Sequence, residues 1–161
     1  MPVVIRRARP DEAGLVLSLV RELADYEKLS DEVEATEQMI ADALFAANPR
    51  LFCDIAEWNG EVAGFAVWFL NFSTFSGRSG IYLEDLFVRP GLRGKGIGKA
   101  LLSHLARACV ANGWSPLQWS VLDWNTPSIE FYKSLGAVLM DDWTMCKVTG
   151  PALAALAEGS G

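Results

Sequence analysis

Hydrophobic and polar positions in the N-terminal part of the chain predict one strand and two helices. The apolar run from Val3 to Arg7 has the length of a short strand. Pro10 and the two acidic residues after it suit the positive end of a helix. The apolar side chains of this helix recur every four residues, at Leu15, Leu19 and Leu23. A second helix is predicted from about Thr36 to Ala46.

The middle of the chain predicts three strands and a long helix. Two apolar runs, residues 51–58 and 62–71, flank Asn59-Gly60, which is a strong signal for a hairpin turn. A third strand runs from Ile81 to Val88. A glycine-rich turn then leads into an amphipathic helix from about Gly98 to Asn112, and Gly113 is suited to end it.

The remaining residues predict shorter elements and complete the pattern. These are a strand over 117–122, a short helix from Pro127 to Gly136, closing strands over 137–140 and 143–148, and a weak helix or frayed tail over 151–158. The order of elements predicts an α/β fold, in which a mixed, mostly antiparallel sheet carries helices on both faces. We expect a single domain spanning residues 1–161.

Composition and charge exclude several classes of function. The net charge of −6 disfavours nucleic acid as a partner. No apolar run approaches the roughly 20 residues that span a bilayer, so no membrane partner is expected. No export signal is visible, which predicts a cytoplasmic location. His104 is the only histidine and the three cysteines are widely spaced, so we expect reduced thiols and no metal site.

The glycine-rich turn is the strongest chemical signal in the sequence. It comprises Arg93, Gly94, Lys95, Gly96, Ile97, Gly98 and Lys99. Alternate glycines leave backbone N–H groups uncovered at the positive start of a helix, which makes a cradle for a diphosphate. A Walker A loop fits badly, because Ala100 follows Gly98-Lys99, and a Rossmann fingerprint fails in both spacing and place.

This loop resembles the R/Q-x-x-G-x-G/A pyrophosphate loop of the GNAT acetyltransferases. Further blocks resemble the diamine acetyltransferase branch, which includes the spermidine/spermine and thialysine N-acetyltransferases. They are residues 22–27 (ELADYE), 82–88 (YLEDLFV), 123–125 (DWN) and 131–137 (FYKSLGA). The resemblance covers the chain up to about Lys147. It implies the GNAT fold, acetyl-CoA as co-substrate, and direct acetyl transfer to a primary amine of a small cationic substrate.

The resemblance also assigns roles to residues of the reaction centre. Glu84 would take the proton of the substrate ammonium, directly or through water, and Tyr132 would protonate the departing thiolate. In a regular strand, Glu84 and Asp85 point to opposite faces, so at least one is expected to be partly buried. Asp85 would contact the cationic substrate or make a structural hydrogen bond. Tyr26 and Glu27 match a substrate-binding pair, although Glu27 is equally compatible with a solvated helix end.

The cofactor contacts implied by the resemblance continue outside the loop. The backbone of Leu86, Phe87 and Val88 would pair with the pantetheine amides, in a strand that carries a bulge in the family. Asn125 would contact the pantetheine arm, cap the following helix, or do both.

One segment differs from the polyamine enzyme in a way that bears on which substrate is expected. Residues 73–78 (STFSGR) replace a segment that is acidic and Trp-bearing there, which favours a thialysine-like amino acid over a long polyamine. Two other activities stay open, a non-catalytic acyl-CoA-binding sensor and a peptide or protein N-acetyltransferase. The family also implies a homodimer formed through C-terminal strands, where this chain has Trp143 and Met145.

Overall fold

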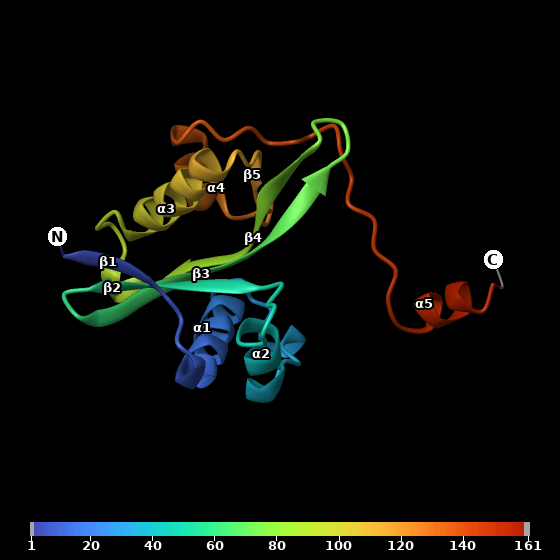
Figure 1. The fold of residues 1–161 in the computed structure, drawn as a ribbon, viewed down its shortest axis with the longest axis horizontal. Coiled ribbons are helices and arrows are strands. Elements are labelled where there is room, and N and C mark those ends of the chain that lie inside the picture. Colours follow the sequence, from blue (N-terminus) through green and yellow to red (C-terminus); the bar gives the residue numbers. More distant parts are fainter. Residues whose placement is uncertain (1, 160–161) are drawn as a thin grey trace. The chain divides into compact units, whose positions relative to one another are not determined.

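The computed structural model describes residues 2–159, which form two compact units; the first extends to Leu122 along the chain and the second begins at Asp123. The first unit contains a five-stranded sheet (Figure 1). Its strands are β1 Val3–Arg7, β2 Phe52–Trp58, β3 Glu61–Ser73, β4 Arg78–Val88 and β5 Leu117–Gln118, and they lie side by side in that order. The first four pair antiparallel, and β4 pairs with β5 in parallel. The predicted mixed, mostly antiparallel sheet is confirmed.

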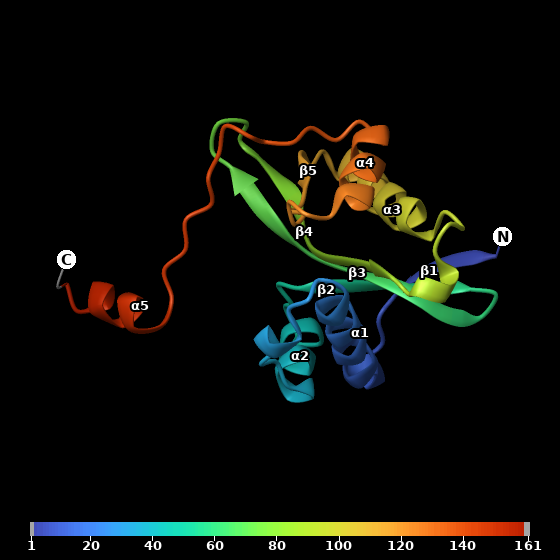
Figure 2. The same cartoon turned by 180° about the vertical axis from the view of Figure 1, so that it is seen from behind.

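Helices cover both faces of this sheet, as predicted. In Figures 1 and 2, α1 (Ala13–Tyr26) and α2 (Glu37–Leu44) lie on one face, and α3 (Ile97–Asn112) lies on the other. Thr36 begins α2 by accepting a hydrogen bond from the backbone N–H of Met39 at 3.2 Å. Short 3-10 turns precede or follow these elements at Pro10–Glu12, Ser30–Glu32 and Pro90–Leu92.

Two sets of buried side chains hold the first unit together. On the α1 face, Leu19 and Leu23 of the helix pack with buried strand residues, namely Cys53, Ile55, Phe65, Val67 and Phe87. The buried side of α3 consists of Ile97, Leu101, Leu102, Leu105 and Cys109. This buried stripe packs α3 against the sheet. Only residues 89–96 connect the end of β4 to the N-terminus of α3.

The second unit contains α4 (Thr126–Ser134) and α5 (Gly150–Ala157). The closing strands predicted over 137–140 and 143–148 are wrong, because the described chain has no strand there. The strand predicted over 117–122 is confined to Leu117–Gln118. Apolar character alone produced these predictions, but a strand also needs a neighbour with which to form its hydrogen bonds, and residues 137–148 have none among residues 2–159.

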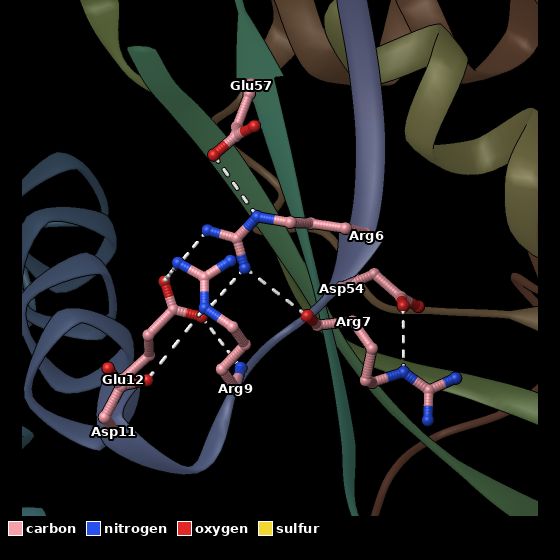
Figure 3. A network of polar contacts seen from close by, with 7 residues as sticks. All are labelled: Arg6, Arg7, Arg9, Asp11, Glu12, Asp54 and Glu57. Carbon is pink, nitrogen blue, oxygen red and sulfur yellow. Dashed lines mark hydrogen bonds and ion pairs between the residues drawn. The ribbon is translucent and has the colours of Figure 1, made fainter. Parts of the chain in front are cut away.

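Charged residues join β1 to the start of the first helix (Figure 3). The Arg6 guanidinium donates two hydrogen bonds of 2.8 Å to the Glu12 carboxylate and one of 3.2 Å to Glu57. The backbone N–H of Arg9 also donates to Glu12, at 2.7 Å. The hydrogen bonds from Arg6, with that from Arg9, lower the pKa of Glu12 from 4.5 to about 2.

We predict that Glu12→Gln destabilises the protein in a pH-dependent way. Because the folded pKa is depressed, ionised Glu12 stabilises the fold above about pH 4.5, and this contribution disappears as the pH falls through about 2. The free energy of unfolding in urea should drop by about 1–3 kcal/mol at pH 7. The deficit should vanish near pH 2. Glu61→Gln, at an exposed carboxylate, is the control. If it lowers the free energy of unfolding as much as Glu12→Gln does, the stabilising role assigned to Glu12 is contradicted.

Candidate active site

Strand β4 contains a β-bulge at the predicted catalytic carboxylates. Trp68 of β3 pairs with Leu83, but its neighbour Val67 pairs with Asp85, so Glu84 is an extra residue on β4. An inserted residue bends its strand and increases the local twist. The structure therefore has the bulge that the family resemblance implies.

The bulge changes which side chains share a face of the sheet. Leu83 lies opposite Trp68, whose indole N–H donates to Asp54 at 2.7 Å, and the carboxylate of Asp54 lies 3.7 Å from Nε2 of His104 on α3. Leu83 therefore belongs to the α3 face. Phe87, by contrast, is part of the core on the α1 face. Asp85, two residues away in the regular part of β4, shares the face of Phe87.

In a regular strand, Leu83, Asp85 and Phe87 would share one face. Because the bulge changes the alternation after Leu83, Leu83 lies on the opposite face from Asp85 and Phe87. The expectation that Glu84 or Asp85 is partly buried is confirmed: Asp85 is half-buried, and Glu84 is exposed.

Beyond the bulge, the edge of β4 that faces β5 is open. Pairing with β5 is confined to Ile81 and Tyr82, so within the described chain no strand pairs with this edge from Glu84 onward. The N–H of Arg89 donates to Ala63 of β3 at 2.8 Å. Because hydrogen bonding alternates along an antiparallel pair, the backbone groups of Phe87 also point to β3, and those of Leu86 and Val88 point to the open edge.

Gly64 allows β3 to lie close to this part of β4. A Cβ atom added there would come within 2.3 Å of the Phe87 carbonyl oxygen, which agrees with that carbonyl pointing towards β3. Our sequence reasoning missed Gly64. The signal was present, since an isolated glycine within a strand often marks a close approach of backbone.

The glycine-rich loop follows directly and leads into α3. Gly94 and Gly96 have φ angles of +79° and +81°, and a Cβ atom added to either would meet no atom within 4 Å. Gly96 immediately precedes the first helical residue, Ile97. The loop thus exposes backbone at the positive end of a 16-residue helix, with open space where side chains would otherwise lie.

Arg93 connects this loop to the end of α1. Its Nε atom donates to the Val88 carbonyl oxygen at 2.9 Å. Its guanidinium lies 4.6 Å from the ring centre of Tyr26 and 5.5 Å from that of Phe87, distances typical of cation–π contacts. Arg93 therefore brings the predicted cofactor loop and the predicted substrate residue Tyr26 together.

Three carboxylates influence one another beside this contact. Burial, with the negative charges of Glu84 and Glu27, raises the pKa of Asp85 from 3.8 to about 7. Burial also raises the pKa of Glu27. Asp85 forms no ion pair within residues 2–159. The cluster is therefore suited to a cation, and Asp85 is poised to exchange a proton near neutral pH.

The other two predicted site residues lie in the second unit. Asn125 is 5% exposed and its Oδ1 atom accepts a hydrogen bond from the Ser128 backbone N–H at 3.3 Å, which confirms it as the cap of α4. Tyr132 lies within α4, with its ring centre 5.6 Å from that of Phe131.

Two kinds of feature are not found in the described part of the chain. Residues 2–159 contain no group of three or more His, Cys, Asp or Glu side chains arranged to hold a metal ion. None of the helices they form has the length and apolar character needed to cross a membrane.

We predict that neutralising Asp85 stabilises the fold. Because its pKa is raised on folding, the carboxylate destabilises the folded state increasingly as the pH rises from about 4 through 7. Asp85→Asn should therefore increase the free energy of unfolding at pH 8 by about 2–4 kcal/mol. The gain should fade to nothing below pH 4. Glu84→Gln, at the exposed neighbour, is the control, and an equal gain there would refute the special environment of Asp85.

Comparisons with known proteins agree with this architecture. The profile of the Acetyltransferase (GNAT) family matches residues 17–137. Thialysine N-epsilon-acetyltransferase of Bos taurus is 38% identical, over 96% of this chain and 97% of its own. L-ornithine N5-acetyltransferase NATA1 of Arabidopsis thaliana is 29% identical, over 94% of this chain and 86% of its own. The structure of an integron cassette protein from the mobile metagenome of V. cholerae superimposes with a TM-score of 0.81 at 30% identity. The match covers 98% of this chain and 99% of the other.

Proposed function

Because this chain belongs to the GNAT acetyltransferase family and is an N-acetyltransferase, we propose that it transfers an acetyl group from acetyl-CoA to the primary amine of a small cationic substrate. The observation that carries this proposal is the adjacency of two binding features. The open backbone edge of β4 ends at Val88, and the glycine-rich loop begins five residues later at Arg93.

Each feature suits one part of acetyl-CoA. The N–H and C=O groups of Leu86 and the N–H of Val88 would pair with the pantetheine amides, as a peptide strand would. The uncovered backbone at Gly94 and Gly96 would receive the diphosphate, where a side chain would otherwise fill the space. Lys95 and Lys99 add positive charge to the same loop.

We assign the proton transfers to residues of this chain as follows. The substrate amine arrives as an ammonium ion, and Glu84 takes its proton directly or through water. Asp85 and Glu27 supply the negative charge that holds the cation. Tyr132 gives a proton to the departing thiolate, for which a phenol with a pKa of about 10 is well matched. The exposure of Glu84 at the bulge supports its role, because it allows the proton to pass to solvent.

For the substrate, we infer a small molecule with a primary amine at the end of an aliphatic chain. The relatives named above act on thialysine and L-ornithine, and both compounds have that form. The turn between β3 and β4 supports the inference, since residues 73–77 carry no acidic side chain for the further ammonium groups of a long polyamine.

We predict that Gly96→Ala weakens acetyl-CoA binding at least about tenfold, or 1.4 kcal/mol, because the added methyl group enters the space meant for the diphosphate. Gly113→Ala is the matched control. It lies at the other end of α3, has a φ of +70°, and also meets no atom within 4 Å, so backbone strain is similar. Titration calorimetry compares the two variants. Equal affinity of folded Gly96→Ala and Gly113→Ala would remove the loop assignment.

We predict that Glu84→Gln lowers the turnover rate by about 10²–10⁴ and that activity recovers partly at high pH, where free amine is abundant. Tyr132→Phe should reduce turnover most with acetyl-CoA and less with an acyl donor whose leaving group is a stable anion. Acetyl-CoA affinity should barely change in either variant. Near-normal turnover of both variants across pH would show that the roles are wrong even though the family is right, and Asp85→Asn would then be the next variant to test.

We also propose a homodimer, with contacts made by the second unit. This segment exposes more than half of several large apolar side chains, namely Val138, Met140, Trp143 and Met145. Sedimentation at micromolar concentration should give twice the monomer mass, and replacing Trp143 and Met145 by Ser should halve it. Val110→Ser on α3 removes an equally exposed apolar side chain and should leave the mass unchanged. A monomeric native protein would reject the proposal.

A further inference from the structure

An open pocket of about 540 Å³ lies where β3 extends past the end of β2. Its lining is Pro49, Arg50, Leu51, Phe52, Phe69 and Leu70. The last residue pair between the two strands is Phe52 with Trp68, so Phe69 and Leu70 lie on the part of β3 that β2 does not cover. Arg50 is the one charged residue in this lining, and the other five residues are apolar. A cavity of this size suits a small molecule rather than a single ion.

One residue of the pocket lining, Phe69, lies near Asp85 in the sheet. Asp85 pairs with Val67, and Phe69 is two residues further along β3 on the same face of the sheet. Two residues in a strand span roughly 7 Å, so Phe69 is a diagonal neighbour of Asp85. The ring of Phe69, which lines the pocket, packs against that of Tyr82 with centres 5.3 Å apart, and this contact restrains its side chain.

The charged residue near Phe69 and the charged residue in the pocket lining have opposite signs. Asp85, with Glu27 and Glu84 close enough to raise its pKa, forms a negative end without a cation of its own. Arg50 forms the positive end and has no ion pair within the described chain. The other residues that line the pocket are apolar. A ligand that matches this arrangement has an ammonium group at one end, an aliphatic segment, and an anionic group at the other.

We propose that Arg50 binds the carboxylate of the substrate and so makes this enzyme selective for amino acids with an amine at the end of the side chain, in preference to diamines. This inference rests on the proposed function. A guanidinium pairs with a carboxylate through two parallel hydrogen bonds. A diamine of the same length keeps the ammonium group at this end but lacks the carboxylate, so only the repulsion between like charges remains beside Arg50.

The test compares pairs of amines that differ only in the carboxylate. L-ornithine is matched with 1,4-diaminobutane, and L-lysine with 1,5-diaminopentane. The native enzyme should have a kcat/KM at least about tenfold higher for each amino acid. Arg50→Gln should remove this preference by raising KM for the amino acid and slightly lowering KM for the diamine, from which it removes a repulsion, with kcat little changed for either. Arg50→Glu should reverse the preference. Arg107→Gln, on exposed α3 surface, makes the same charge change and should alter neither member of a pair.

The outcomes separate this inference from the proposed function. Equal kcat/KM values within each pair, or an Arg50→Gln variant that changes both members equally, would overturn the role of Arg50 while amine acetylation stands. If neither series is acetylated, the role of Arg50 and the small-amine activity both fail. Because Arg50 is exposed, its replacement should leave the melting temperature unchanged, and thermal unfolding checks that the variants are folded.

Discussion

The extra residue at Glu84 in β4 is the feature on which the rest of the site depends. A β-bulge bends and twists its strand, and here the parallel pairing with β5 ends at Tyr82, two residues before the bulge. Beyond that point, no strand within residues 2–159 pairs with the backbone edge at Leu86 and Val88. The inserted residue also shifts the alternation of side chains between the two faces of the sheet, and this places Asp85 on the face covered by α1. One inserted residue therefore positions both the strand edge and the carboxylate that we assign to the two substrates.

The placement of Asp85 is unfavourable for the isolated protein. Its carboxylate is half-buried, has no cation within residues 2–159, and has Glu27 and Glu84 as electrostatic neighbours. Desolvation and like charges both disfavour its ionised form, which is why its pKa rises to about 7. A bound ammonium group would relieve both effects. The arrangement is therefore better explained by a ligand than by the stability of the fold, because folding alone would favour a neutral side chain at this position.

Arg93 makes the cofactor loop and the substrate side of the site parts of one structure. It belongs to the glycine-rich loop, yet its guanidinium packs on Tyr26 at the end of α1 and donates to the carbonyl oxygen of Val88. That carbonyl lies on the open edge of β4, where the pantetheine arm is expected. The side chain of Arg93 thus contacts the strand edge and the helix from the loop. The sequence motif had indicated only that this residue is positively charged.

The sequence by itself determined the elements whose signals are local. The Asn59-Gly60 turn, the apolar stripe of α3 and the glycine-rich loop each depend on residues close in the chain, and all three appear where they were expected. The closing strands predicted near Trp143 were wrong, because a strand requires a neighbouring strand that local hydrophobicity does not specify. Only the tertiary structure decided that Glu84 is the inserted residue, that Asp85 is the less exposed carboxylate of the pair, and that Arg50 and Phe69 line one pocket. Each of these facts depends on the register between strands or on segments distant in sequence, and a shift of one residue reverses the face of every side chain that follows.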